Sequence, residues 1–435
     1  MTPMKQNPSA IETVKAIQIY DSRANPTFEV EITLADGTTG RAMVPSGAST
    51  GKFEALELRD GTSRFSGKGV DRAIKNVNEV LGPAITGLDA RDQKKIDSVL
   101  ISTDGTPDKS RYGANAILGC SLAACYAAAN FEKKPLYRYL GGAMASTIPV
   151  PMVQIIGGGA HAVNTTDIQD YLVIPLSAKS FSAGYEMVTE TYHAAKRVFK
   201  RLNKPLSIAD EGGLWPTGFT SNEEGLELLV ESIKEAGYVP GVDLGIALDV
   251  ASSEFYDEVS GEYVLSLENR RLKPSELIDM LCSWCKKYPI VSIEDGTAET
   301  DWDGCKELSA RLGGKIQLIG DDLFTTNIQR IRRGVIEGCC NSVLIKMNQI
   351  GTISETVEAV AYTQRHGYKP VISARSGETE DATIVHLAIA TGAGQLKVGS
   401  AARSERTAKW NEAIRIEAAL GESAYYPSAH IFERN

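Results

Sequence analysis

The feature of this sequence that most constrains its fold is a series of short apolar runs in the second two-thirds of the chain. The runs are LGIAL before Asp249, IVSI before Glu294, QLIG before Asp321, SVLI before Lys346, PVIS before 374–376 and QL before Lys397. Continuous apolar runs are typical of buried parallel strands. Charged side chains at the carboxyl ends of such strands mark the catalytic face of a TIM-type barrel. The series therefore predicts an α/β barrel, and a doubly wound sheet whose acids cap helices is the alternative.

The first third of the chain has a different pattern, which is typical of an α+β unit. Thr27–Leu34 alternates apolar and polar residues and leads into Ala35-Asp36-Gly37, which indicates a strand followed by a hairpin turn. Apolar residues then recur at helical spacing within 74–81 and 115–129. We therefore expect a few strands followed by helices.

The change of pattern predicts a domain boundary. Ser146–Met152 carries two prolines and follows a pair of glycines, as a connection between domains often does. The sequence thus predicts an N-terminal α+β domain at 1–145 and a barrel domain at 146–435.

Composition and charge argue against several classes of partner. The 46 Lys and Arg residues are outnumbered by 55 Asp and Glu, the net charge is −9, and no basic run stands out. Such a chain is a poor candidate for nucleic-acid binding. No apolar run approaches the roughly 18–20 residues of a membrane helix, and Met1–Ser9 lacks the apolar core of a secretory signal. We expect a cytoplasmic protein with no membrane partner.

Three of the strand-end residues are acids that predict a metal site. Asp249, Glu294 and Asp321 should meet at one mouth of the barrel. Three carboxylates without histidine or cysteine suit a hard cation, Mg²⁺ rather than Zn²⁺. The alternative is that each acid caps a helix or pairs with a lysine.

Two lysines at the ends of later runs indicate proton transfer. Lys346 and Lys397 belong to the same series as the acids. A second cation and a metal nearby should lower the pKa of such a lysine, and a neutral lysine can abstract a proton. A structural ion pair with the same acids is the alternative.

Glycine-rich loops supply further candidates. Glu211 lies in Ala209–Gly213, where the glycines allow the backbone to approach a ligand. His161 follows Gly157-Gly158-Gly159-Ala160 in a segment that could act as a lid. The GxSxG pattern at 47–51 is a weak indication of a hydrolase, because no helical pattern follows it. We expect a Gly/Ser loop over a ligand there.

Taken together, these residues identify the chain as resembling the enolase family over nearly its whole length. The matching segments are DSRANPT (21–27), PSGASTG (45–51), EALELRDG (54–61), YGANAILG (112–119), GGAHA (158–162), DEGG (210–213), ALDVASSEFY (247–256), SIEDG (292–296), GDDLFTTN (320–327), KMNQIGT (346–352), RSGETED (375–381) and ARSER (402–406).

The resemblance implies a fold and a cofactor. It implies an N-terminal α+β capping domain followed by a modified eight-stranded TIM-type barrel. It implies Mg²⁺ held by Asp249, Glu294 and Asp321, with a second Mg²⁺ that arrives with the substrate and is helped by Ser49. The family also suggests a homo-oligomer, either a dimer or an octamer.

The resemblance further implies roles for individual side chains. Lys346 would be the base at the α-carbon, and Glu211 the acid that protonates the leaving hydroxyl. Lys397 would bind the substrate carboxylate, and Arg375 and Ser376 its phosphate.

Three more residues are expected at the same site from the resemblance. Asp170 and His161 are candidates for the catalytic set. Gln169 is expected on the substrate side, together with Ser49.

The sequence departs from the family pattern mainly on the side of the leaving group. The family has Ser-His-Arg-Ser where this chain has Ala374 before Arg375, and Gln-Glu where it has Gln169-Asp170. Trp215 replaces a small residue after the Asp-Glu-Gly-Gly motif. An acid one methylene shorter is withdrawn by about 1.5 Å, and a misplacement of that order can cost about 10²-fold in rate.

Two other departures lie elsewhere in the chain. Ala24 stands for a glycine of the family, and His386 for an aspartate. We assign His386 no role at this stage.

These departures favour a diverged paralogue that keeps the enediolate chemistry but has a changed leaving group or acceptor. Its substrate would be a small phosphorylated or phosphonylated carboxylic acid, as in the enzyme of phosphonate-antibiotic biosynthesis that makes carboxyphosphonoenolpyruvate. One alternative is an ordinary glycolytic enolase, which converts 2-phosphoglycerate to phosphoenolpyruvate and water. A second is a non-catalytic enolase-like binding protein. The sequence leaves the acceptor, the pathway and the oligomeric state open.

Overall fold

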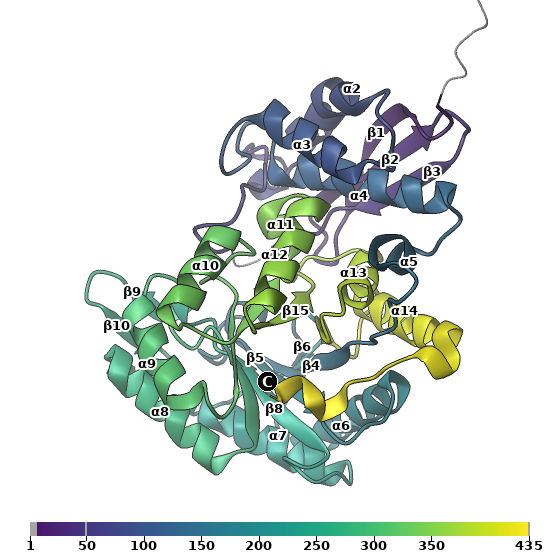
Figure 1. Ribbon diagram of the computed structural model, residues 1–435. Helices are drawn as coiled ribbons and strands as arrows, with labels where there is room; N and C mark the ends of the chain where they lie inside the picture. Colours follow the sequence, from purple (N-terminus) through teal and green to yellow (C-terminus); the bar gives the residue numbers. More distant parts are fainter. Residues whose placement is uncertain (1–6, 48–49, 434–435) are drawn as a thin grey trace, which may run out of the picture.

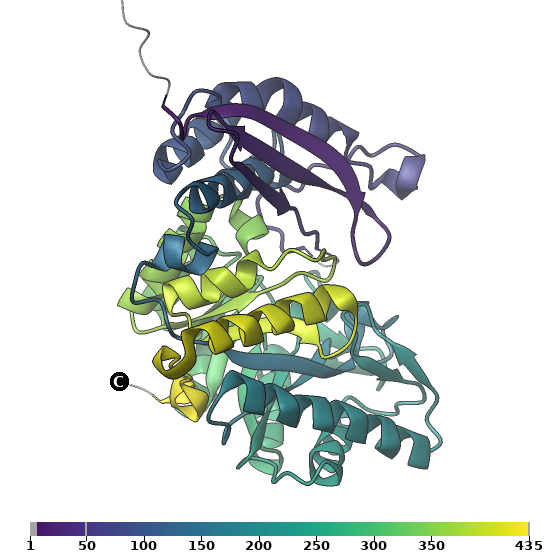
Figure 2. The same cartoon turned by 90° about the vertical axis from the view of Figure 1, so that its right-hand side faces the viewer.

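The computed structural model describes residues 7–47 and 50–433, and within them it shows two parts (Figure 1). A small α+β domain lies against one face of a larger barrel. In the view turned by 90°, the purple N-terminal sheet lies at the top and the teal helices of the barrel at the bottom (Figure 2).

The N-terminal domain is an antiparallel sheet with helices packed on it. The strands are β1 (Ile11–Tyr20), β2 (Pro26–Leu34) and β3 (Thr39–Met43), in the order β1-β2-β3. The helices are η1 (Arg64–Gly67), α1 (Asp71–Asn76), η2 (Val77–Leu81), α2 (Gly82–Ile85), α3 (Gln93–Asp104), α4 (Ala114–Phe131) and α5 (Leu136–Gly141). The predicted hairpin is confirmed, since β2 and β3 pair through Thr33 and Thr39.

Helix α4 is the core helix of this domain. It is rich in alanine and packs across β2 and β3. By length and composition it could cross a membrane, but 83% of it is buried inside the protein, as is usual for the core helix of a globular domain. Gly40 on β3 allows this close packing, because a Cβ there would lie 2.0 Å from the backbone nitrogen of Ala127.

The second part is a closed barrel of eight strands with helices outside. The barrel strands are β4 (Val150–Gly157), β5 (Asp170–Pro175), β8 (Leu244–Asp249), β12 (Ile290–Glu294), β13 (Gln317–Gly320), β14 (Ser342–Ile345), β15 (Lys369–Ser373) and β16 (Gln395–Ser400). Pairing of β16 with β4 closes the barrel. The predicted fold class is therefore confirmed.

Helices cover the outside of the barrel. They are α6 (Phe181–Arg201), α7 (Glu223–Glu235), α8 (Pro274–Lys287), α9 (Trp302–Leu312), α10 (Ile328–Glu337), α11 (Met347–Ile350), α12 (Ile353–Arg365), α13 (Thr383–Thr391) and α14 (Ser404–Leu420). Short 3-10 helices are η3 (Gly159–His161), η4 (Ser252–Phe255), η5 (Gly421–Ser423) and η6 (Ser428–Phe432).

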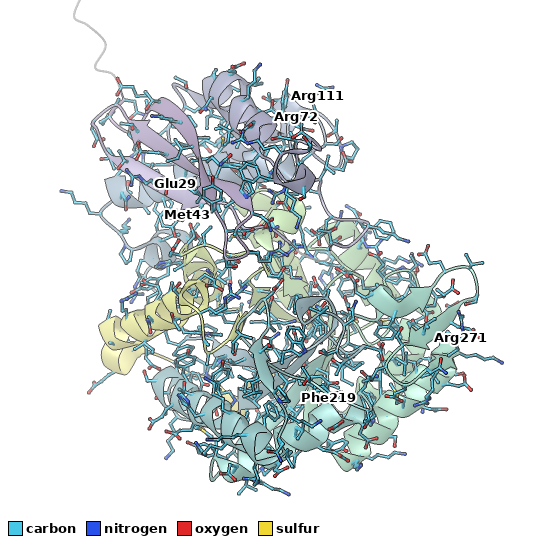
Figure 3. All side chains as sticks on the ribbon, turned by 180° about the vertical axis from the view of Figure 1, so that it is seen from behind. Glu29, Met43, Arg72, Arg111, Phe219 and Arg271 are labelled. Atoms are coloured by element: carbon cyan, nitrogen blue, oxygen red, sulfur yellow. The ribbon has the colours of Figure 1, made fainter. Side chains whose placement is uncertain are left out.

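Two small additions extend the barrel. The hairpin of β6 (Leu206–Ile208) and β7 (Leu214–Pro216) adds to β4. The sheet of β9 (Tyr256–Asp257), β10 (Glu262–Leu265) and β11 (Arg270–Leu272) projects from the surface, with Arg271 at its outer edge (Figure 3).

One barrel strand runs against the others. Strand β5 is antiparallel to both β4 and β8, whereas the other neighbouring strands are parallel. The amino end of β5 therefore lies at the face where the parallel strands end, and Asp170 pairs in register with Asp249. The reversal brings Asp170 to the catalytic face.

The apolar runs predicted most of the barrel strands but placed one residue wrongly. Lys397 lies inside β16, which continues to Ser400, rather than at the end of its strand. It still reaches the catalytic face, because it pairs with Ser373, the last residue of β15. Between α5 and β4 runs the connecting segment in which we propose the domain boundary, after residue 145.

The N-terminal domain docks on this same face through backbone and side-chain contacts. Ser46 and Gly377 exchange two backbone hydrogen bonds of 2.8 and 2.9 Å. Glu54 of the N-terminal domain pairs with Arg375 of the barrel at 2.9 Å. Loops of both domains therefore enclose the mouth of the barrel.

A substitution in the N-terminal core tests this packing. Gly40→Ala should lower the free energy of unfolding by roughly 1–3 kcal/mol, because the new Cβ forces β3 and α4 apart. Urea unfolding followed by circular dichroism measures the loss. Gly314→Ala is the control, since a Cβ at Gly314 meets nothing within 4 Å. Equal stability of the two variants would contradict the packing described.

Candidate active site

The centre of the candidate site is a buried lysine between two carboxylates. Lys397 Nζ lies 2.7 Å from Asp249 Oδ2 and 2.8 Å from each oxygen of Glu294. These acids come from β8 and β12, whose register aligns them. Burial alone would lower the pKa of Lys397, but Asp249 and Glu294 outweigh burial and raise that pKa well above its usual value. The ammonium form is the stable one in this arrangement.

The second lysine forms a similar pair with the third acid. Lys346 donates to Asp321 Oδ2, and Gln349 Nε2 donates to the other oxygen at 2.8 Å. Burial lowers the pKa of Lys346, but the negative charges of Asp321, Asp322 and Glu294 together outweigh burial and raise this pKa above its usual value. The lowered pKa was expected for a lysine beside a bound metal ion, whereas here the lysine contacts a carboxylate directly.

The three predicted metal-ligating acids have the chemistry that Mg²⁺ requires. Burial and then the Asp249 carboxylate raise the pKa of Glu294 well above its usual value, which shows how strongly negative charge is crowded here. All donors are carboxylate oxygens, the ligands that Mg²⁺ prefers. Asp249, Glu294 and Asp321 therefore fit the predicted ion. Ser49, the further predicted ligand, lies outside the described residues.

A second group of acidic side chains shares Asp321 with the first, and one of its members has a structural role. Oxygens of Asp295, Asp321 and Asp322 approach within 4.8 Å of one another. The Asp295 carboxylate, however, accepts from the backbone N–H groups of Asp321 and Asp322 at 2.9 and 2.8 Å. It thereby holds the segment that carries Asp321.

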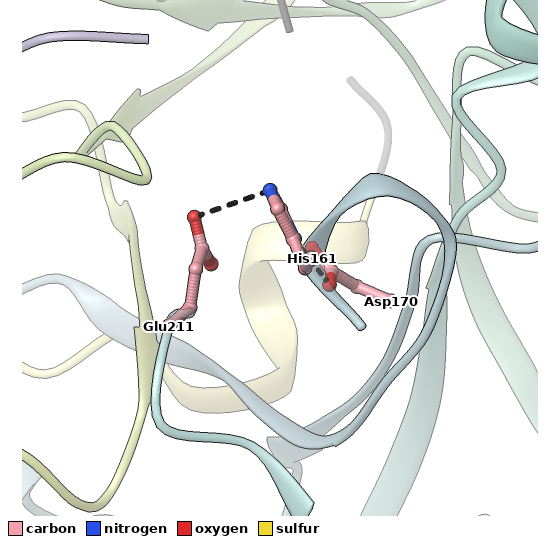
Figure 4. A group of neighbouring side chains, drawn as sticks. All are labelled: His161, Asp170 and Glu211. Carbon is pink, nitrogen blue, oxygen red and sulfur yellow. Dashed lines mark hydrogen bonds and ion pairs between the residues drawn. The ribbon is translucent and has the colours of Figure 1, made fainter. Parts of the chain in front are cut away.

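The opposite wall of the site joins His161 to two carboxylates (Figure 4). His161 Nδ1 lies 3.0 Å from Asp170 Oδ1, and its Nε2 lies 3.8 Å from Glu211 Oε1. Burial lowers the pKa of His161, but Asp170 and Glu211 outweigh it and raise the pKa to about 9. An imidazolium between the two acids supplies the positive charge that a metal ion could otherwise provide for this group.

The loop after β15 forms the third side of the site. Arg375 donates to Glu54 at 2.9 and 3.2 Å and to Asn348 at 2.9 Å. Arg406, fully buried on α14, donates to the backbone carbonyls of Arg375 and Ser376 at 2.7 and 2.6 Å. Both side chains fix the loop at the mouth of the barrel.

One pocket collects most of the residues singled out from the sequence. Its lining includes His161, Gln169, Asp170, Glu211, Asp249, Lys346, Arg375, Ser376 and Lys397. Glu294 and Asp321 lie behind the lysines that they contact. The structure thus brings together every predicted site residue in its described part.

Two of the residues that depart from the family pattern lie away from the pocket lining described here. Trp215 is on β7 and does not belong to that lining. His386 on α13 lies 3.5 Å from Glu412 and stacks on Tyr137, so it is a packing residue. Ala374 does line the pocket.

Two oxygens in the pocket remain available for a ligand. Gln169 Oε1 and Asp170 Oδ2 are buried and have no hydrogen-bond partner among the described residues. Buried acceptors usually find a donor. A substrate hydroxyl or a water molecule is the donor that this wall of the pocket can take.

Several side chains of the site were missed by sequence reasoning. They are Gln154, Gln349, Glu54 and Arg406. Gln349 and Arg406 lie within segments that match the family, KMNQIGT and ARSER, and this match was the signal that could have found them. Gln154 lies in none of these segments.

The His161 cluster predicts a dependence of stability on pH. A folded-state pKa of about 9, above the usual 6.5, contributes stability that is complete below pH 6.5 and is lost as the pH rises through 9. The contribution is on the order of 3 kcal/mol. Urea unfolding of wild type and His161→Gln should therefore differ most near pH 6 and converge near pH 9.5. His430→Gln, at an exposed histidine, is the control; a difference between wild type and His161→Gln that does not vary with pH would refute the assignment.

Comparison with known proteins agrees with the fold. The model of the family "Enolase, N-terminal domain" matches residues 11–140, and that of "Enolase, C-terminal TIM barrel domain" matches residues 145–435. Among curated proteins, the chain is 69% identical over 422 residues to "Enolase 1" of Desulfitobacterium hafniense (strain Y51), a match that covers 97% of each chain.

These comparisons overturn the expectation of a diverged paralogue of phosphonate biosynthesis. A relative this similar along nearly its whole length, named as an enolase, favours the alternative of an ordinary enolase. The structure supplies a physical reason, because the shorter Asp170 still contacts His161 and also accepts from Gln154. The chain belongs to the enolase family and is a Mg²⁺-dependent lyase.

Proposed function

We propose that the protein is a phosphopyruvate hydratase, which interconverts 2-phosphoglycerate with phosphoenolpyruvate and water. The observation that carries the proposal is the pocket itself, whose lining includes both Lys346 and the pair of Glu211 and His161. A base and an acid that line one pocket suit the removal of a proton and of a hydroxyl from neighbouring carbons. The name of the curated relative supports the same reaction.

The metal requirement follows from the charge that this reaction develops. Removal of a proton beside a carboxylate leaves a dianionic centre, which bound Mg²⁺ stabilises by its charge. Asp249, Glu294 and Asp321 would hold the ion. We expect a second Mg²⁺ to arrive with the substrate, with Ser49 among its ligands.

Lys346 would accept the α-proton and must be neutral to do so. Asp321 holds it as an ammonium. Asp321 would also be one of the residues that hold Mg²⁺, whose positive charge would favour the neutral form of Lys346. Gln349 orients Asp321 through a hydrogen bond of 2.8 Å to its other oxygen.

Glu211 would deliver a proton to the leaving hydroxyl. The imidazolium of His161 lies between Glu211 and Asp170. Gln169 Oε1 and Asp170 Oδ2, which lack a hydrogen-bond partner among the described residues, would offer acceptors to the hydroxyl before it leaves.

Charged side chains around the pocket would bind the rest of the substrate. Lys397 suits its carboxylate, and Arg375 with Ser376 suits its phosphate, because guanidinium groups bind phosphate with two parallel hydrogen bonds. The partner is thus a small phosphorylated carboxylic acid. A homo-oligomeric assembly, as a dimer or an octamer, and a cytoplasmic location complete the proposal.

Substitution of the acids tests the metal site. Replacing Asp249, Glu294 or Asp321 by alanine should abolish Mg²⁺ binding at the first site, because each removes one of few oxygen ligands. Isothermal titration calorimetry with Mg²⁺ measures the loss. Asp303→Ala, at an acid whose side chain is 95% exposed, should bind as wild type does. Binding of wild-type strength in all three variants would reject the site.

A pair of variants separates the two halves of the reaction. Wild type should form phosphoenolpyruvate, followed by its absorbance, at a rate of about 10–10³ s⁻¹. Lys346→Ala should stop exchange of the α-proton of 2-phosphoglycerate with deuterium from solvent. Glu211→Gln should leave this exchange largely intact and stop product formation, since the base acts before the acid. Exchange that survives in the lysine variant would exclude Lys346 as the base, and absence of product from wild type would refute the reaction.

A further inference from the structure

A buried glutamine joins the two acidic segments of the pocket wall. Gln154 lies on β4 and has no exposed surface. Its Nε2 donates to Asp170 Oδ1. Its Oε1 accepts from the backbone N–H of Gly213 at 2.9 Å. One amide group thus spans from the reversed strand β5 to the loop that carries Glu211.

The Glu211 loop has a glycine, Gly213, at the point where Gln154 contacts it. A Cβ at position 213 would lie 2.2 Å from Gln154 Oε1, so only glycine permits the approach. The loop is a tight turn, because Ala209 and Gly213 share one backbone hydrogen bond of 2.9 Å and Ala209 accepts another from Gly212 at 2.9 Å. By holding Gly213, Gln154 holds the whole turn.

The contact with Asp170 determines which of its oxygens faces the pocket. Oδ1 accepts from both Gln154 and His161. Oδ2 has no hydrogen-bond partner among the described residues and lies 4.0 Å from Lys397 Nζ. Without the donor from Gln154, His161 alone would hold the carboxylate, which could then rotate about its short side chain.

We propose that Gln154 is a positioning residue for the water-expelling half of the reaction, which sets Asp170 and the Glu211 turn relative to one another. It acts through these two groups and does not touch the substrate. This inference rests on the proposed dehydration. It also explains how the shorter aspartate at position 170 can take the place of the family's glutamate, because the amide of Gln154 extends to the aspartate and holds its carboxylate.

A variant that keeps the shape of the side chain but removes its polar atoms tests the proposal. Gln154→Met should lower the rate of phosphoenolpyruvate formation by about 10²-fold through misplacement of the acid side. Exchange of the α-proton of 2-phosphoglycerate should stay near the wild-type rate, because Lys346 and Asp321 do not contact Gln154. KM should change far less than kcat.

A second buried glutamine provides the matched control. Gln317 begins β13 at the opposite end of the barrel and bonds to Ser342 and Gln395. Gln317→Met also removes a buried amide and should cost stability, but both half-reactions should remain as in wild type. If Gln154→Met and Gln317→Met have the same effect on dehydration, or if exchange falls together with dehydration, the positioning role is refuted.

Exchange of one methylene between the two side chains gives a rescue experiment. Gln154→Asn shortens the amide, and Asp170→Glu lengthens the acid by the same amount. Each single variant should dehydrate more slowly than wild type. The double variant should recover most of the loss, because the summed length is restored and the two sites are coupled. Additive losses would overturn the proposal.

A readout that needs no turnover keeps this inference separate from the proposed reaction. The titration of His161, followed by nuclear magnetic resonance, should shift in Gln154→Met, since Asp170 changes its position beside the ring. It should remain as in wild type in Gln317→Met. A wild type that makes no phosphoenolpyruvate would refute the reaction, whereas an unshifted His161 in Gln154→Met would refute the positioning role.

Discussion

The buried ammonium of Lys397 between Asp249 and Glu294 is the interaction on which the rest of the site depends. Carboxylates that converge in a buried place repel one another, and each is costly to keep charged away from water. Lys397 contacts two of them and Lys346 contacts the third. Because the two ammonium groups offset much of the negative charge of the three acids, the acids can stay close together at the ends of neighbouring strands. Carboxylates held this close together could also coordinate a divalent cation.

The reversal of β5 is the second constraint, and it limits what the sequence could predict. The runs that end in Asp249, Glu294, Asp321 and Lys346 mark strands whose carboxyl ends form the site, and these strands were predicted. Strands β4 and β5 end in Gly157 and Pro175 and carry no such mark. That β5 runs antiparallel follows from its pairing on both sides, which no pattern within the strand reveals. Periodicity therefore could not assign Asp170 to the site, and this assignment depended on the resemblance, while its pairing with Asp249 is seen only in the structure.

The same contrast holds for the candidate site. Acids and lysines at strand ends predict a charged site from their position in the sequence alone, and in the structure these side chains lie close together. Gln154 and Gln349 are neutral amides inside apolar or mixed segments. They contribute to the site through hydrogen bonds to other residues, which the sequence does not reveal. The prediction that Asp170 is too short considered this residue without the side chains that contact it. The acid lost a methylene relative to the family, but its contacts to His161 and Gln154 are present.

The pocket also depends on the docking of the two domains. Arg375 on the barrel is buried and pairs with Glu54 of the N-terminal domain. A buried ion pair contributes little net stability, because desolvation offsets its attraction, but loss of either partner leaves an unpaired charge. Such a pair therefore favours one relative placement of the domains. On the far side of the same loop, the buried side chains of Arg406 and Lys409 donate to its backbone carbonyls. The loop is thus held from the N-terminal domain and from α14 at once, which keeps Arg375 and Ser376 in place in the lining of the pocket.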